Sequence, residues 1–201
     1  MPIKFLKDKS NKKYITIVSG LPRSGTSMMM NMLQSGGMPL VVDHIREPDE
    51  DNPKGYFEFE PVKKIKEGDF FWIAGSYGKA IKIVSPLLKY LPSDNKYKVI
   101  FMRRNIEEII ASQNKMLLRL GQDHDAKGNA KMATKFERHL QQIDRWLSTQ
   151  INIEILNVIY SDVIRDPHHY SDIVNRFLDG KLNVPKMAQT VERSLYRQRK
   201  F

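Results

Sequence analysis

The sequence predicts an α/β fold with a central parallel sheet of about four to five strands flanked by helices. Apolar, β-branched runs alternate along the chain with segments of helical periodicity, which is typical of parallel strands joined by crossover helices. A glycine-containing loop joins the first of these runs to a helix. The length of 201 residues suits one domain with one core. We therefore expect residues 1–201 to form a single unit, with a basic, flexible N-terminus at 1–13.

The first half of the chain yields two candidate strands, one helix and a long loop. Residues 14–19, YITIVS, are apolar and β-branched and predict a buried strand. Residues 26–35 have a helical pattern that ends at two consecutive glycines. PLVVD, residues 39–43, is a candidate for a short second strand. Residues 45–60 are polar and rich in turn formers, and they predict a long loop.

The middle of the chain repeats the alternation of strand and helix. Residues 79–85 predict a strand, and Pro86 then opens a short helix. The run 97–103, YKVIFMR, predicts a strong strand. The following helix begins after Asn105, a favourable N-cap, and ends at Gly121.

The last third begins with a loop at 120–130 and continues with an amphipathic helix over 130–150. INIEILNVIYS, residues 151–161, predicts the last strong strand. The rest of the chain is expected to be helical and basic. Because the carboxyl ends of parallel strands meet at one edge of the sheet, polar residues that follow these strands are expected to lie together.

Composition restricts the classes of function. Thirty-three Lys and Arg against 23 Asp and Glu give a net charge of +10, which favours anionic partners. The absence of cysteine excludes disulfides and thiolate chemistry, and it agrees with a cytoplasmic protein. No apolar run approaches the roughly 20 residues of a membrane span, and the N-terminus lacks the apolar core of a signal peptide. No basic–aromatic pattern indicates nucleic acid binding.

The loop IVSGLPRSGTSM, residues 17–28, resembles a phosphate-binding loop that lacks its lysine. Gly20 and Gly25 occupy the positions of the two glycines of a P-loop, and Thr26 stands where a nucleoside triphosphatase has lysine. Backbone amides at a strand–loop–helix junction bind a phosphate or sulfate without that lysine. Arg23 supplies positive charge from within the loop. The pattern therefore indicates anion binding and argues against hydrolysis of ATP or GTP.

A second anion site is predicted in MRRNIEEIIAS. Arg104 follows a strand, and Ser112 lies eight positions later on the next helix. Eight residues are about 2.2 helical turns, so the two side chains can share a face. A guanidinium and a hydroxyl together suit a phosphate group.

These two motifs resemble those of the sulfotransferase family, whose donor is 3′-phosphoadenosine 5′-phosphosulfate (PAPS). The resemblance implies a P-loop, sulfotransferase-like topology and release of 3′,5′-phosphoadenosine (PAP). It implies that Arg23 contacts the bridging oxygen and sulfonate, and that Arg104 and Ser112 bind the 3′-phosphate. The residues that it assigns to the 5′-phosphate are Ser24, Gly25, Thr26 and Ser27.

KAIKIVSPLLKYLP, residues 79–92, resembles a third segment of that family. There Lys82 matches the lysine that contacts the sulfonate, and Val84 replaces the histidine that is the general base in the cytosolic branch. Our first candidate for a replacement base is Glu58, because bacterial sulfotransferase-like proteins carry a similar glutamate. The other acidic and basic candidates are Glu60, Asp43 and His44.

Other positions depart from the family pattern. Met28 stands where the family has an adenine-stacking tryptophan. The family's basic C-terminal motif is absent, and Arg197, Arg199 and Lys200 are candidates to replace it. Tyr160 and Asp162 are interpreted as structural. No metal site is predicted.

The leading hypothesis is a PAPS-dependent sulfotransferase acting on a hydroxyl or amine of a small molecule or glycan. Two alternatives stay open. One is a P-loop kinase or NTPase with a degenerate loop, in which Asp43 or Asp162 holds Mg²⁺. The other is a non-catalytic PAPS or nucleotide-binding protein. The sequence identifies neither the acceptor nor the oligomeric state.

Overall fold

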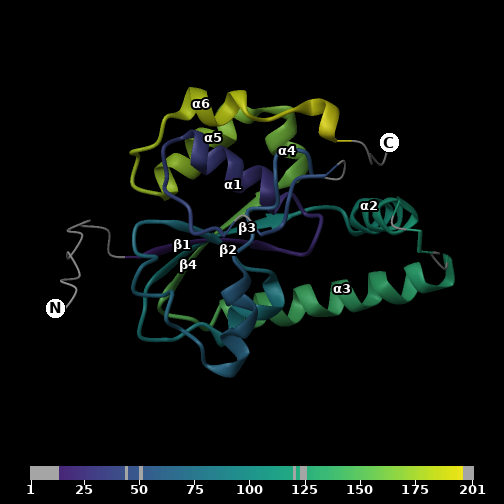
Figure 1. Cartoon of the computed structure of the whole chain (residues 1–201), viewed down its shortest axis with the longest axis horizontal. Helices are drawn as coiled ribbons and strands as arrows, with labels where there is room; N and C mark the ends of the chain where they lie inside the picture. Colours follow the sequence, from purple (N-terminus) through teal and green to yellow (C-terminus); the bar gives the residue numbers. More distant parts are fainter. Residues whose placement is uncertain (1–13, 44, 50–51, 120, 123–125, 197–201) are drawn as a thin grey trace.

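The sheet contains four parallel strands in the order β2-β1-β3-β4 (Figure 1). This computed structural model describes residues 14–43, 45–49, 52–119, 121–122 and 126–196. The strands are β1 (Ile15–Gly20), β2 (Ala80–Lys82), β3 (Tyr97–Arg103) and β4 (Ile153–Ile159). The predicted α/β class and parallel sheet are confirmed. Residues 1–13, His44, Arg197, Arg199 and Lys200 lie outside the described residues.

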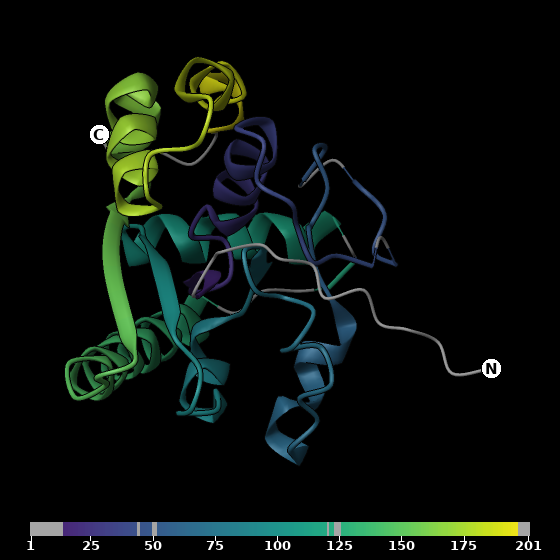
Figure 2. The same cartoon turned by 90° about the vertical axis from the view of Figure 1, so that its left-hand side faces the viewer.

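Helices cover both faces of the sheet, as Figures 1 and 2 show. One face carries α1 (Thr26–Ser35), α4 (Tyr160–Arg165), α5 (Pro167–Phe177) and α6 (Val184–Gln189). The other face carries the 22-residue α3 (Ala126–Leu147) with the 3₁₀ helices η1 (Glu60–Glu67) and η2 (Ser85–Tyr90). The remaining helices are α2 (Ile106–Arg119) and the 3₁₀ turn η3 (Arg193–Leu195). None of the described helices has the length and apolar character needed to span a membrane.

Alternating side chains of β1 divide the core into two clusters, because successive residues of a strand point to opposite faces. Val18 packs with the buried methionines of α1, and Met187 of α6 joins the same cluster. Ile15 and Ile17 pack on the other face with residues of η1, η2 and α3. Both faces of the central strand are therefore anchored, and the loop that follows β1 leaves from a rigid support.

The candidate strand at 39–43 is reduced to a single parallel bridge between Leu40 and Ala80. Beyond that bridge the chain turns, because the carboxylate of Asp43 accepts hydrogen bonds from the amides of Ile45 and Glu60. The candidate second strand is therefore absent from the sheet, which has the lower of the two expected numbers of strands. The segment predicted as a short helix after residue 85 is the 3₁₀ helix η2.

The strand order creates a crevice at the carboxyl ends of β1 and β3. The chain passes from β1 through α1 to β2 at one edge, whereas β3 and β4 lie on the other side of β1. In open α/β sheets, ligands bind where connections diverge in this way. Gly20 pairs with Met102, so the loop after β1 and the residues after β3 meet at the same level.

Asn105 caps α2 as predicted, and its Oδ1 accepts hydrogen bonds from the amides of Glu107 at 2.8 Å and Glu108 at 3.3 Å. At the far end of α2, Gly121 has a φ of 70°, and its amide bonds to the carbonyl of Leu118. The cap orients the first turn of α2, which carries Glu108, the acidic partner of Arg104.

We expect Asn105→Ala to lower the free energy of unfolding by about 1 kcal/mol, because two amides at the helix start lose their acceptor. Urea denaturation measures the change. Asn105→Asp keeps an acceptor and should retain most of the stability. An alanine variant as stable as the parent protein would contradict the capping role.

Candidate functional site

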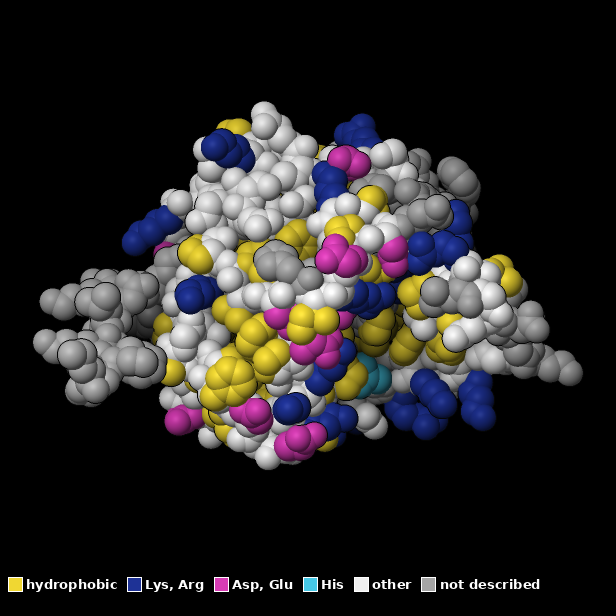
Figure 3. Space-filling view, viewed as in Figure 1, with side chains coloured by type: hydrophobic (Ala, Val, Ile, Leu, Met, Phe, Trp, Pro, Cys, Tyr) yellow, Lys and Arg dark blue, Asp and Glu magenta, His cyan; other side chains and the backbone are white. Residues whose placement is uncertain are grey.

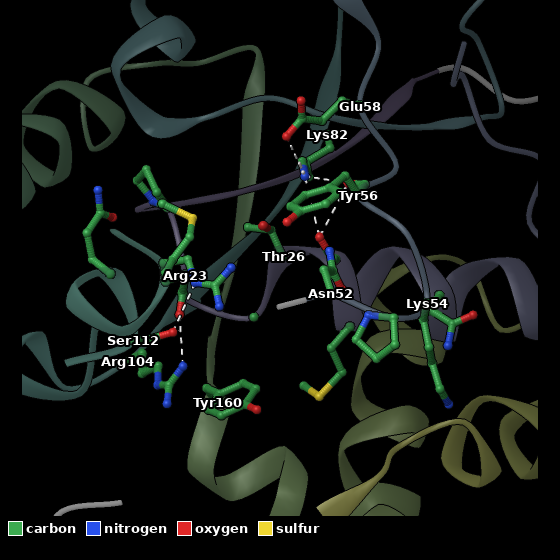
Figure 4. Close-up of a pocket in the computed structure, with 18 of the residues that line it drawn as sticks. Arg23, Thr26, Asn52, Lys54, Tyr56, Glu58, Lys82, Arg104, Ser112 and Tyr160 are labelled. Atoms are coloured by element: carbon green, nitrogen blue, oxygen red, sulfur yellow. Dashed lines mark hydrogen bonds and ion pairs between the residues drawn. The ribbon is translucent and has the colours of Figure 1, made fainter. Parts of the chain in front are cut away.

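A cavity of about 390 Å³ opens at the carboxyl ends of the strands (Figure 4). Its walls come from the loop after β1 with the start of α1, the ends of β2 and β3, the middle of α2, the start of α4, the loop before η1 and the segment after α6. Nearly all of the site residues predicted within the described part of the chain line it: Arg23, Gly25, Thr26, Ser27, Glu58, Lys82, Arg104 and Ser112. The exception is Ser24, which lies 1% exposed beneath the loop.

The loop after β1 can form only with glycine at two positions. A Cβ on Gly20 would lie 2.5 Å from Ser24 Oγ, and one on Gly25 would lie 2.4 Å from the Tyr160 ring. Gly25 also has a φ of 98°, a left-handed conformation that disfavours other residues. The result is a tight turn at the start of α1 that leads directly into the helix. Such turns present backbone amides to anions.

Ser24 has a buried hydroxyl with no hydrogen-bond partner among the described residues. Burying an unpaired hydroxyl is unfavourable. The hydroxyls of Thr16 and Ser19 in β1 are buried in the same way, so this feature of Ser24 does not by itself indicate a ligand.

The first group of side chains, the Arg104 cluster, consists of Arg23, Arg104, Glu108 and Ser112. Arg23 Nε donates to Ser112 Oγ at 2.9 Å, and Arg104 Nη1 donates to the carbonyl of Arg23 at 3.0 Å. Arg104 Nε also donates to Glu108 Oε2 at 3.0 Å. The predicted approach of the two motifs is therefore present. Arg23, however, points to Ser112, at the opposite end of the cavity from Lys82 (Figure 4).

The second group, the Lys82 cluster, consists of Ser27, Tyr56, Glu58 and Lys82. Lys82 Nζ donates to the carbonyl of Tyr56 and lies 3.4 Å from Ser27 Oγ. Glu58 Oε1 is 3.5 Å from the same amine and 3.1 Å from Nη1 of Arg46. Two cations thus flank the Glu58 carboxylate, which is the predicted base.

Burial lowers the pKa of Lys82 from 10.5 to about 8. Removing an ammonium group from water disfavours its charged form, and the Glu58 carboxylate opposes that effect only in part. The side chain of Lys82 is 8% exposed. An added anion beside this amine would favour the protonated form, so the position suits a negatively charged ligand.

The loop before η1 is fixed over the Lys82 cluster by Tyr56 and its neighbours. The Arg46 guanidinium carbon lies 3.3 Å from the centroid of the Tyr56 ring, and the Tyr56 hydroxyl donates to the carboxylate of Asp49 at 2.8 Å. Lys54 reaches the segment after α6, where it pairs with Glu192 at 2.6 Å. The sequence analysis treated this loop as a whole and missed these four anchoring residues of the loop.

The other acidic candidates have local partners. Asp43 binds two backbone amides, and Glu60 pairs with Lys63 at 2.6 Å. Asp162 pairs with Arg165 at 2.8 Å and accepts a hydrogen bond from Tyr170. None of the three lines the cavity. Within the part of the chain that the structure describes, no group of three His, Cys, Asp or Glu residues could hold a metal ion.

Tyr160, interpreted from sequence as structural, belongs to the site. It lines the cavity, packs against Gly25, and its ring centroid lies 4.6 Å from the guanidinium carbon of Arg104. Met28, the residue in place of the family tryptophan, also lines the cavity.

A comparison with protein-family models matches the model described as "Sulfotransferase domain" over residues 15–201. Among solved structures, the sulfotransferase STF1 from Mycobacterium tuberculosis H37Rv is 14% identical, with a TM-score of 0.57 and coverage of 91% of this chain and 72% of that one. The sulfotransferase domain from the curacin biosynthetic pathway is 14% identical, with a TM-score of 0.53 and coverage of 89% and 78%.

The sulfotransferase domain from the Synechococcus PCC 7002 olefin synthase is 15% identical, with a TM-score of 0.52 and coverage of 94% and 81%. At these identities the solved structures support the fold alone. No curated protein sequence matches the chain.

We expect the Lys82 amine to titrate near pH 8, and Glu58→Gln to move its pKa lower because a neighbour that stabilises the charge is lost. Between about pH 8 and 10.5, the unfolded chain binds more protons than the folded one, so Lys82 should make the free energy of unfolding rise with pH. NMR titration of labelled lysines measures the pKa, with Lys82→Met to identify the signal. A Lys82 signal that titrates at its ordinary value would contradict the effect of burial.

Proposed function

Since this chain belongs to the sulfotransferase family, we propose that it transfers a sulfonate group from PAPS to a hydroxyl or amine of a small-molecule or glycan acceptor. The observation that carries the donor assignment is the presence of two separate anion-binding arrangements on one cavity. One is the glycine loop with Thr26 and Ser27, and the other is the pair Arg104 and Ser112. PAPS carries a 5′-phosphosulfate and a 3′-phosphate, which match two such sites.

The glycine loop suits the 5′ end of this donor. Ser24 has an unpaired buried hydroxyl, and Thr26 and Ser27 add hydroxyls at the start of the 10-residue α1. We assign the 5′-phosphate to these groups together with the amide of Gly25. The N-terminal amides of α1 add a favourable partial positive charge.

Arg104 and Ser112 suit the 3′-phosphate. Ser112 Oγ accepts its hydrogen bond from Arg23, so its own O–H is left to donate to a phosphate oxygen. Arg104 lines the cavity and supplies charge-assisted donors. We assign adenine to the side of the cavity that contains Met28, whose thioether can pack on an aromatic ring.

The Lys82 cluster suits the reacting end. In the proposed transfer, a bond forms between the acceptor oxygen or nitrogen and sulfur. The bond from sulfur to the bridging oxygen breaks, and its electron pair stays on the 5′-phosphate of PAP. Lys82 stabilises the charge that develops on the sulfonate and bridging oxygen. Glu58 takes the acceptor proton. Arg23 can join Lys82 there only if its guanidinium leaves Ser112.

The kinase or NTPase alternative gains no support from the structure. Thr26 stands in place of the lysine, and the two candidate Mg²⁺ ligands, Asp43 and Asp162, have local partners away from the cavity. The non-catalytic alternative is tested by transfer of the sulfonate itself.

We expect PAP to bind more than about tenfold tighter than AMP, because only PAP engages the second anion site. Ser112→Ala should weaken PAP about tenfold and leave AMP unchanged, whereas Ser24→Ala should weaken both. Isothermal titration calorimetry measures the affinities. Ser148→Ala, which removes an exposed hydroxyl outside the cavity lining, is the matched control. Equal affinities of the parent protein for PAP and AMP would overturn the donor assignment.

For catalysis, Glu58→Gln should slow sulfonate transfer about 100-fold while PAP affinity changes less than about twofold, because the side chain keeps its size and loses its basicity. Transfer is measured with ³⁵S-labelled PAPS and a panel of alcohols, phenols and amines. An unchanged rate would remove Glu58 as the base. Tight PAP binding by the parent protein without transfer to any acceptor of the panel would favour the non-catalytic alternative.

A further inference from the structure

Arg104 is held from several directions, by Glu108 four residues along the chain and by three groups that are distant in sequence. Its Nε donates to Glu108, its Nη1 donates to the carbonyl of Arg23, and its guanidinium carbon lies 4.6 Å from the Tyr160 ring and 5.5 Å from the Tyr196 ring. The side chains of Arg104 and Glu108 are each 8% exposed. A buried arginine with this many neighbours has few orientations available, so its direction into the cavity depends on them.

Glu108 is shared between Arg104 and the C-terminal segment. One carboxylate oxygen accepts from Arg104 Nε at 3.0 Å, and the other accepts from the hydroxyl of Tyr196 at 2.6 Å. Burial and the Glu108 carboxylate raise the pKa of Tyr196 to about 12, so its hydroxyl keeps its proton and remains a donor. Tyr196 also packs edge-on against Tyr160, with ring centroids 5.2 Å apart.

We propose that Tyr196 is a positioning residue for Arg104 and thereby sets the preference for nucleotides that carry a 3′-phosphate. The proposal rests on the function proposed above. A carboxylate beside a guanidinium favours a two-pronged pair in which both oxygens face the arginine. The Tyr196 hydroxyl draws one oxygen of Glu108 toward itself. Glu108 therefore holds Arg104 through Nε, and the Nη edge is directed toward Arg23 and the cavity.

The geometry also explains why the effect should be selective. Tyr196 contacts Glu108, Arg104 and Tyr160 and does not line the cavity, so the loss of its hydroxyl acts first on the Arg104 cluster. Removing its hydroxyl leaves the ring in place against Tyr160. Affinity for a nucleotide without a 3′-phosphate should then be retained, while the contribution of Arg104 to binding the 3′-phosphate declines.

The test is calorimetry of PAP and AMP with Tyr196→Phe. We expect PAP affinity to fall about fivefold and AMP affinity to stay within about twofold. Tyr170→Phe is the matched control, because Tyr170 also donates its hydroxyl to a carboxylate, that of Asp162 at 3.2 Å, but this carboxylate pairs with the exposed Arg165. The control should leave the ratio of PAP to AMP affinity unchanged.

A double-mutant cycle establishes whether Tyr196 acts through Arg104. In an Arg104→Lys background there is no guanidinium to orient, so adding Tyr196→Phe should change PAP affinity by less than about twofold. An equal loss of PAP and AMP affinity in Tyr196→Phe, or an unchanged ratio, would overturn the positioning role. A parent protein without a preference for PAP would instead overturn the proposed donor.

Discussion

The parallel pairing of β1 with β3 is the constraint on which the candidate site depends. Gly20 lies opposite Met102, so Arg23 and Arg104 leave neighbouring strand ends at the same level. The hydrogen bond from Arg104 to the carbonyl of Arg23 follows from this register. A shift by one residue would turn every side chain of β3 to the opposite face, which both core clusters forbid. Core packing thus fixes the separation of the two anion-binding arrangements.

The site is cationic, and two of its buried cations are paired with carboxylates. Lys82 pairs with Glu58, and Arg104 pairs with Glu108, in both cases with the partner on a neighbouring element or turn. Burying an arginine or lysine without a partner is strongly unfavourable, so these carboxylates allow the cations to sit beneath the surface. Cations that are exposed to solvent need no such partner, and Lys and Arg side chains gather on the surface along α3 (Figure 3).

The sequence predicts the regular parts of the fold because periodicity and caps are local signals. The strands at 14–19 and 97–103 and the cap at Asn105 are all present. The strand predicted at 39–43 fails because Asp43 bonds to the amide of Glu60, a residue 17 positions away, which no local pattern reveals. Alternation of apolar residues predicts which face of a strand is buried, but it does not predict how far the adjacent strand extends.

Some contacts of the candidate site could also be predicted, and others could not. Helical spacing predicted that Ser112 lies near Arg104, and the family resemblance alone indicated that Lys82 and Glu58 belong to the same site. The contact between Arg23 and Ser112 could not be predicted from the sequence, and neither could the role of Tyr160. Both depend on side-chain rotamers and on packing between the loop after β1, α2 and α4. Sequence patterns identify which elements meet and leave undetermined which atoms do.

The buried amine of Lys82 has one more consequence. With a pKa of about 8, it exists as a mixture of ammonium and neutral amine in mildly alkaline solution. Any anion that settles beside it makes the ammonium form more favourable, so association draws hydrogen ions out of the buffer. The heat of association then includes the buffer's ionisation enthalpy, and the apparent affinity weakens as the medium becomes more alkaline.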